Sequence, residues 1–201
     1  MKIFAVAGAY DAEPSVDVAL PLRVDPVWYE IPDSAISRTG NPFFIPDSGS
    51  DYVAFPSAAY RICKLGKTVA QRFAPRYYDE ATIGFSVVAV DILRSLRKAG
   101  LPWTRAVAFD RSCMLGNFMP LSAFMEKRTF EITCGSQTIS YSLASAIPGI
   151  DGMVSKISAD NTIKTGDIIL PALSPCGIAL RMGEKLMVSA AGQNILDINV
   201  K

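Results

Sequence analysis

The stretch YYDEATIGFSVVAVDILRSLRKAGLPW (residues 77–103) decides how the middle of the chain folds. Its apolar run over 82–90 is nearly continuous, which predicts a strand buried on both faces. Asp91 follows this run, and we expect it to cap a helix over 92–99 that ends at Gly100. The arrangement has the frame of an active site, yet the second half of the strand carries no carboxylate, amine or imidazole.

The composition favours an ordinary folded domain and excludes several classes of protein. The chain has 201 residues, and half of them are apolar, which is enough for a sizeable core. No apolar run approaches the roughly 18 residues that a membrane-spanning helix needs. With 20 basic and 19 acidic residues well mixed, the sequence has no basic stripe for nucleic acid. The opening residues 1–14 are read as a strand rather than a signal peptide, so we expect a cytoplasmic protein.

Histidine and paired cysteines are both missing from the sequence. There is no histidine, which removes Ser-His-Asp and Cys-His catalysis and histidine-bound zinc. The four cysteines, Cys63, Cys113, Cys134 and Cys176, are far apart and form no CxxC pair. We therefore expect reduced, structural thiols.

Strand-like segments dominate the rest of the chain. Further strands are predicted over 2–6, 27–30, 58–65, 129–134, 138–142, 168–170, 186–190 and 195–200. Gly135 and Ser136 form a two-residue hairpin signal between two of them. Further helices are predicted over 69–73, before Pro75, and over 150–157. Many strands with a few irregularly placed helices predict an α+β or mixed β-roll domain.

Three longer stretches resemble the fumarylacetoacetate hydrolase family. The first is PFFIPDSGSDYVAFPSAAYRICKLGKTVAQRFAPRYYDE (42–80), which contains RICKLGK. The second is LRKAGLPWTRAVAFDRSCMLGNFMP (96–120), which contains KAGLPW and AFDRS. The third combines MVSKISADNTIKTGDIIL (153–170) with SPCGIALRMGEKLMV (174–188). Their order and spacing match the family over roughly 25–200.

This resemblance implies a fold, an assembly and a chemistry. It implies one α+β domain over 1–201 with a mixed β-roll or β-sandwich and a few short helices. Residues 1–25 would be a degenerate N-terminal lid or strand region, and 26–201 the core. Members are usually homodimers, and active ones hydrolyse, decarboxylate or isomerise 2-oxo and diketo acids. They use Mg²⁺ or Mn²⁺ held by three carboxylates, because a hard cation prefers oxygen ligands.

In this chain the positions that match the family's charged groups are neutral. The resemblance places the three metal-binding carboxylates at Phe55, Ser57 and Ser86. It places the residues that contact the substrate at Ile31, Val107, Ser174 and Pro175, where the first two match lysines of the family. We therefore expect no metal ligand, no catalytic residue and no cofactor here. A buried charge without a partner is costly, so neutral replacements would stabilise a fold that no longer needs the metal.

Three functional interpretations remain open. The favoured one is a non-catalytic pseudoenzyme that forms a homodimer and binds a partner or a small 2-oxo acid. The alternative is a working metal-dependent hydrolase, isomerase or decarboxylase of the family, with displaced ligands drawn from Asp47, Asp51, Asp79 and Glu80. The third is metal-free chemistry or ligand binding in a residual pocket lined by Ser57, Ser86, Cys113 and Arg111.

Overall fold

The computed structural model describes residues 1–6, 27–143, 149–174 and 177–201. Its strands are β1 (Lys2–Val6), β2 (Trp28–Pro32), β3 (Ile36–Arg38), β4 (Tyr52–Ile62), β5 (Tyr78–Ala89), β6 (Cys113–Leu115), β7 (Met119–Pro120), β8 (Thr129–Cys134), β9 (Gln137–Ser142), β10 (Ile168–Leu170), β11 (Ile178–Ala179), β12 (Lys185–Ala190) and β13 (Gln193–Asn199). Its helices are η1 (Asp33–Ala35) and η2 (Gln71–Arg76), both 3₁₀, and α1 (Val90–Lys98), α2 (Thr104–Val107), α3 (Leu121–Glu126) and α4 (Ile150–Asp160).

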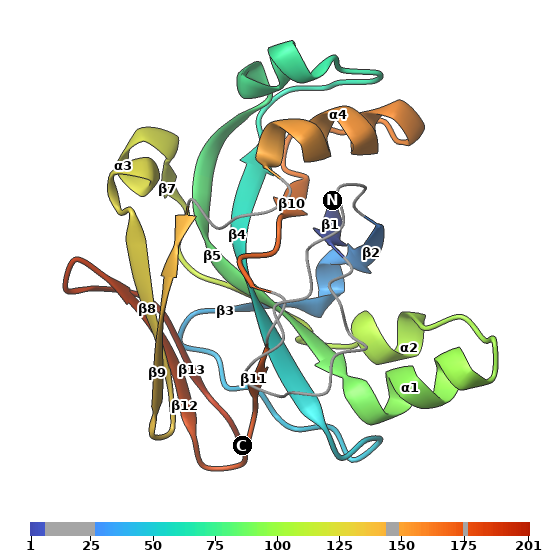
Figure 1. Ribbon diagram of the computed structural model, residues 1–201, viewed down its shortest axis with the longest axis vertical. Coiled ribbons are helices and arrows are strands. Elements are labelled where there is room, and N and C mark those ends of the chain that lie inside the picture. Colours follow the sequence, from blue (N-terminus) through green and yellow to red (C-terminus); the bar gives the residue numbers. More distant parts are fainter. Residues whose placement is uncertain (7–26, 144–148, 175–176) are drawn as a thin grey trace.

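The two longest strands, β4 and β5, form a bent antiparallel pair at the centre of the molecule (Figure 1). They have 11 and 12 residues, and every residue of β5 from Ala81 to Ala89 is buried. A strand covered on both faces has no polar side to show, so its sequence is apolar throughout. The predicted strand in the quoted stretch is therefore confirmed.

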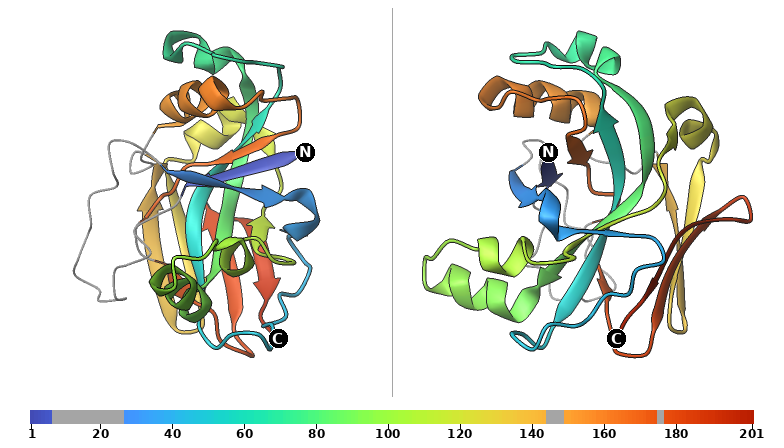
Figure 2. Two further views of the ribbon diagram at one scale, coloured as in Figure 1. Left: turned by 90° about the vertical axis from the view of Figure 1, so that its right-hand side faces the viewer. Right: turned by 180° about the vertical axis from the view of Figure 1, so that it is seen from behind.

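The larger sheet that contains this pair is mixed and curled. Its strand order is β2-β1-β10-β4-β5-β6-β3, with β11 beside β4 and β7 beside β5. β1 is parallel to β10, and β3 is parallel to β6, whereas the other pairs of this sheet are antiparallel. β1, β2 and β10 lie on the concave side of the long bent pair (Figures 1 and 2). This is the strand-rich, mixed α+β architecture that the sequence predicts.

A second sheet, in the order β13-β12-β8-β9, packs against the convex side of the long pair (Figures 1 and 2). In β12 and β8 buried and exposed residues alternate, as expected for strands with one face on the core. The predicted hairpin is confirmed, since Cys134 pairs with Gln137 across Gly135, whose φ is +56°. β9 is the edge strand and is largely exposed.

Hydrophobic residues fill both sides of the large sheet. The main cluster lies between the two sheets and includes Ile83 and Phe85 of β5 and Leu196 of β13. Two smaller clusters lie on the opposite face, one around Ala59 and the other around Phe55. The alternation of side chains along β4 therefore decides which residues face the interior of the curl.

Several predicted boundaries are wrong. β4 begins at Tyr52 and not at residue 58. Proline is unfavourable inside a strand because it has no N–H group to donate, which is why residues 52–57 were not expected in this strand. Pro56 is tolerated because β4 has a strand neighbour on only one side at that point. There β4 passes from β10 to β11, and the Pro56 carbonyl accepts a hydrogen bond from Leu173 N. The helix expected before Pro75 is the 3₁₀ helix η2, which includes Pro75, because proline's φ suits such a turn.

The helices also differ in detail from the expectation. α1 ends as predicted, with Gly100 at φ +67°, but Asp91 is not its cap: it lies within the first turn, and Ala89 occupies the cap position. α4 extends to Asp160. α2 and α3 were not predicted. In the part of the chain that the structure describes, no helix is long and apolar enough to cross a membrane.

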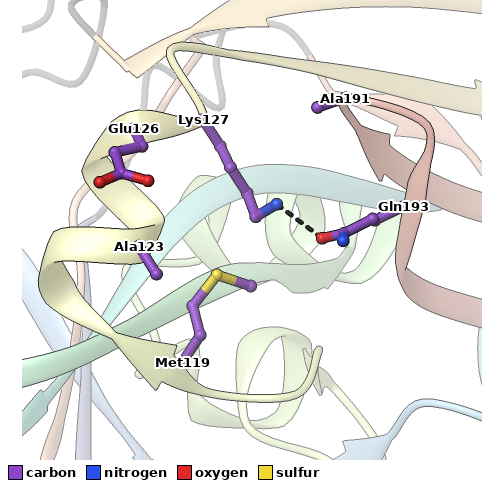
Figure 3. A pocket seen from close by; sticks show the side chains of 6 residues that line it. All are labelled: Met119, Ala123, Glu126, Lys127, Ala191 and Gln193. Carbon is purple, nitrogen blue, oxygen red and sulfur yellow. Dashed lines mark hydrogen bonds between the residues drawn. The ribbon is translucent and has the colours of Figure 1, made fainter.

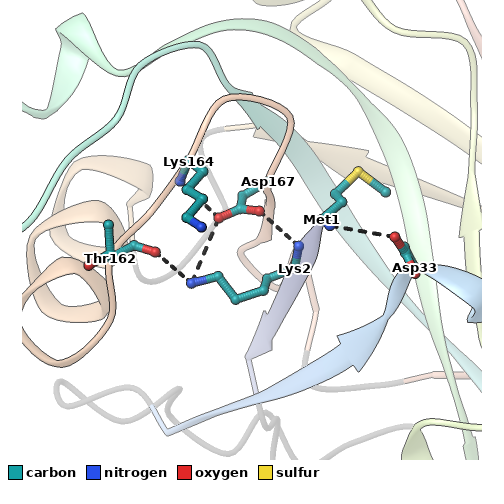
Figure 4. A network of polar contacts seen from close by, with 6 residues as sticks. All are labelled: Met1, Lys2, Asp33, Thr162, Lys164 and Asp167. Carbon is teal, nitrogen blue, oxygen red and sulfur yellow. Dashed lines mark hydrogen bonds and ion pairs between the residues drawn. The ribbon is translucent and has the colours of Figure 1, made fainter.

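A buried carboxylate joins β1 to the loop before β10 (Figure 4). Asp167 accepts hydrogen bonds from the backbone N–H groups of Lys2 (2.8 Å) and Lys164 (2.9 Å). The Lys2 ammonium lies 3.9 Å from the same carboxylate and donates to the Thr162 carbonyl. This network fixes the start of β1 where it must pair in parallel with β10.

Candidate functional site

The three positions that the resemblance assigns to the metal lie together on one face of the central strands. Phe55 of β4 pairs directly with Ser86 of β5, and Ser57 pairs with Gly84, two residues from Ser86. Since side chains alternate along a strand, all three point to the concave face, and directly paired residues have Cβ atoms about 5 Å apart. Ser57 and Ser86 are both buried. The structure thus brings together three residues that are up to 31 positions apart in the sequence.

An apolar cluster surrounds Phe55. It includes Val88 of β5, Leu93 of α1 and Val107 of α2, the position that the resemblance assigns to a substrate lysine. The ring also contacts the segment before β11: a Cβ added at Gly177 would lie 3.0 Å from a ring carbon of Phe55. Only glycine lets this segment approach so closely, because the added Cβ would also clash with a methyl carbon of Val53.

The other substrate-contact positions are distributed around this face. Ile31 of β2 belongs to the neighbouring cluster, together with Ala59 of β4 and Cys113 of β6. Ser174 is buried in the loop after β10, where Ala172 bridges to Ser57. Pro175 lies outside the described residues. The structure therefore brings Phe55 and Val107 into one cluster and places Ile31 in the next.

The groups expected to line a residual pocket do not form a reactive set. Cys113 of β6 pairs with Ser86 of β5. Burial raises the pKa of the Cys113 thiol to about 12, so the thiol stays protonated at neutral pH. Arg111 points elsewhere: its guanidinium donates to the Pro42 carbonyl and lies 5.1 Å from the centre of the Phe44 ring.

The carboxylates considered as displaced ligands lie at the surface. Asp47, Asp51 and Asp79 are exposed, and Glu80 accepts a 2.5 Å hydrogen bond from Arg61, its cross-strand partner. Within residues 1–6, 27–143, 149–174 and 177–201, no three His, Cys, Asp or Glu side chains are close enough together to hold a metal ion. A phenyl ring and two hydroxyls do not fit Mg²⁺ or Mn²⁺, which require several charged oxygen ligands.

Asp91, expected to be a cap, instead holds the loop before β4. Its Oδ2 accepts hydrogen bonds from Ser50 N at 2.8 Å and Ser50 Oγ at 3.1 Å. Burial acts to raise the pKa of Asp91, but the hydrogen bonds from Ser50 and the nearby backbone N–H groups of Ile92 and Asp51 outweigh it and lower the pKa below 3.8. The carboxylate therefore anchors the chain where it enters the central strand.

Replacing Asp91 with asparagine is expected to lower the free energy of unfolding by about 1 kcal/mol at pH 7. Because the folded-state pKa is lowered, the charged form stabilises the fold above the unfolded pKa, and this contribution disappears as the pH falls through the folded-state value. Urea denaturation of both proteins between pH 7 and pH 3 measures this. A difference that grows towards pH 3, or an equal effect of Asp110→Asn at an exposed site, would contradict the assignment.

A pocket that no motif indicates lies away from this face, between α3 and the turn that joins β12 to β13 (Figure 3). Its lining comes from positions 119–127 and 191–193. Residues so distant in the sequence meet only through the packing of the two sheets, so sequence analysis could not identify it.

Comparisons with known proteins identify the family. The family model described as Fumarylacetoacetate (FAA) hydrolase C-terminal matches residues 3–194. The chain is 28% identical over 203 residues to the oxaloacetate tautomerase YcgM of Escherichia coli, covering 96% of this chain and 90% of that protein. It is 26% identical over 157 residues to the mitochondrial oxaloacetate tautomerase of Bos taurus, covering 77% and 71% of the two chains.

Solved structures share the fold at lower identity. A fumarylacetoacetate hydrolase family protein from Yersinia pestis has a TM-score of 0.85 at 20% identity, covering 100% of this chain and 93% of that one. Fumarylpyruvate hydrolase from Pseudomonas aeruginosa, solved in complex with Mn²⁺ and pyruvate, has a TM-score of 0.82 at 20% identity, covering 100% and 89%. Both the predicted fold and the predicted family are confirmed: this chain belongs to the fumarylacetoacetate hydrolase family.

Proposed function

We propose that this chain is a non-catalytic member of the family, which binds a small 2-oxo acid without a divalent cation and does not convert it. The observation that carries the proposal is the cross-strand pair of Phe55 and Ser86, with Ser57 on the same face. If the family's cation belongs at these three positions, a ring and two hydroxyls replace its carboxylates. The homodimer remains a prediction.

The ligand class rests on the relatives and on the two serines. Relatives at 24–28% identity are named oxaloacetate tautomerases, and one is named an oxaloacetate decarboxylase. The buried hydroxyls of Ser57 and Ser86 would donate hydrogen bonds to carbonyl or carboxylate oxygens of such an acid. They supply no charge that could stabilise an enolate, so binding without turnover is what this donor set supports.

A second candidate is a metal-dependent enzyme that acts on oxaloacetate. The names of the relatives favour this candidate more directly than the first, and the 28% identity to the Escherichia coli protein extends over 96% of the chain. It would require metal ligands other than Phe55, Ser57 and Ser86. The exposed positions of Asp47, Asp51 and Asp79 do not supply them on the face described above.

One measurement separates the two candidates. With oxaloacetate, the purified protein is expected to show no tautomerisation or decarboxylation above the buffer rate, with or without added Mg²⁺ or Mn²⁺. Calorimetry on the same sample should show metal-independent binding that Ser57→Ala/Ser86→Ala weakens by about tenfold or more, because two hydrogen bonds are lost. Ser140→Ala, on the exposed strand β9, serves as the matched control. Turnover that EDTA abolishes would establish the second candidate.

A further inference from the structure

The pocket between α3 and the β12–β13 turn has a volume of about 500 Å³, within the range of small-molecule sites. Six side chains line it (Figure 3): Met119, Ala123, Glu126, Lys127, Ala191 and Gln193. It is separate from the face that carries Ser57. Met119 pairs with Ala81 on β5, and both contribute to the core on the opposite side of the sheet.

One part of the pocket presents hydrogen-bond donors. The ammonium of Lys127 donates to Gln193 Oε1 at 2.8 Å, in a contact that is exposed to solvent. This bond uses one of three ammonium protons and the acceptor end of the amide, so two ammonium protons and the amide NH₂ group remain as donors. A cationic group beside an amide donor suits a carboxylate, because charge-assisted hydrogen bonds are the stronger kind.

The rest of the pocket is apolar and includes a methyl group held at an unfavourable backbone conformation. Met119, Ala123 and Ala191 present methyl groups or a thioether. Ala191 has φ +48° and precedes Gly192 at φ +76°, so both residues of this hairpin turn are in the left-handed region. Glycine or asparagine is favoured at the first position of such a turn, so alanine at position 191 adds a methyl group to the pocket lining at a cost in backbone energy.

We propose that this pocket binds a small monocarboxylate with an apolar tail. The carboxylate lies against Lys127 and Gln193, and the tail contacts Met119, Ala123 and Ala191. The exposed carboxylate of Glu126 at the rim repels a second negative charge, so a dicarboxylate is disfavoured. The proposal does not depend on what occupies the concave face of β4 and β5.

The probe is 4-methylpentanoate, titrated into protein labelled with ¹³C in the methionine methyl groups. The Met119 signal is expected to shift and saturate, whereas the signal of Met125, which is exposed on α3 outside the pocket, stays in place. The dicarboxylate glutarate and the uncharged 4-methylpentanamide should each bind at least tenfold more weakly. A Met119 signal that does not move in folded protein, or that responds equally to the amide, overturns the proposal.

Variants test the two ends of the pocket separately. Lys127→Gln keeps a polar side chain without the charge and should weaken binding of the probe about tenfold, whereas Lys98→Gln, on the exposed surface of α1, should not. Ala191→Gly should weaken binding a few-fold while raising the melting temperature, since glycine tolerates the positive φ. A purely structural turn would show the rise in melting temperature alone, and unchanged binding in Lys127→Gln would refute the carboxylate site.

Discussion

Carboxylates placed at Phe55, Ser57 and Ser86 are expected to create a divalent-metal site on the concave face of β4 and β5. The variant Phe55→Glu/Ser57→Glu/Ser86→Asp puts three acids on one face of adjacent strands, at directly paired and diagonal positions. Without metal, their mutual repulsion and burial should lower the free energy of unfolding by several kcal/mol. With Mn²⁺ at 100 times its dissociation constant, binding should restore about 2.7 kcal/mol.

Thermal unfolding with and without Mn²⁺, together with Mn²⁺ electron paramagnetic resonance, measures this effect. The matched control is Phe55→Gln/Ser57→Gln/Ser86→Asn, which has the same shapes without charge and should unfold independently of Mn²⁺. If the triple-acid variant does not fold, Ser57→Glu/Ser86→Asp keeps the Phe55 packing and tests the same site. If the acidic variant folds but its melting temperature does not change with Mn²⁺, the side chains at positions 55, 57 and 86 do not converge on one point. Metal binding by the natural chain would refute the proposed function.

The central part of β5 could be predicted from the sequence because a strand that is buried on both faces consists almost entirely of apolar residues. The continuous apolar run of β5 and the Gly135–Ser136 turn of the β8–β9 hairpin each follow from a local rule. The start of β4 could not be predicted, since Pro56 is acceptable there only because the second side of β4 has no strand neighbour at that point. That exception depends on where β10 and β11 lie.

The short helices α2 and α3 and the role of Asp91 could not be predicted from local sequence patterns, because both depend on tertiary contacts. α2 and α3 have four and six residues and no side-chain cap, so packing and not intrinsic propensity holds them. Asp91 follows the strand as a cap would, but its hydrogen-bond partner is Ser50, 41 positions away. Tertiary contacts of this kind leave no periodic pattern in the sequence.

The candidate site was partly accessible from the sequence. The resemblance assigned Phe55, Ser57 and Ser86 to one place, and the register of β4 against β5 puts them on one face. The sequence could not show that Val107 packs in the cluster around Phe55, nor that Gly177 is placed against its ring. These contacts come from segments that reach the face through separate loops, and they explain how the Phe55 ring is accommodated on this face.

Removal of the Asp167 carboxylate is expected to destabilise the fold strongly, because this carboxylate is buried and accepts two backbone hydrogen bonds. Asp167→Ala leaves the N–H groups of Lys2 and Lys164 without their acceptor in a partly buried setting, and it leaves the Lys2 ammonium without its ion pair. An unsatisfied buried donor costs about 1–3 kcal/mol, so the free energy of unfolding should fall by about 3 kcal/mol or more. Asp167→Asn should recover part of this, because its amide oxygen can still accept one hydrogen bond.

Asp33 provides the matched control for Asp167, because it is also a carboxylate that contacts the first residues of the chain. It lies 3.5 Å from the N-terminal amine with its side chain 58% exposed, so Asp33→Ala should cost less than about 1 kcal/mol. Urea denaturation of the variants measures both effects, and hydrogen exchange at Ile3 and Ile169 should increase in Asp167→Ala only, since these residues lie in the paired strands β1 and β10. Equal small losses in the two variants would mean that parallel pairing alone holds β1 in place, and that the buried carboxylate contributes no more than an exposed one.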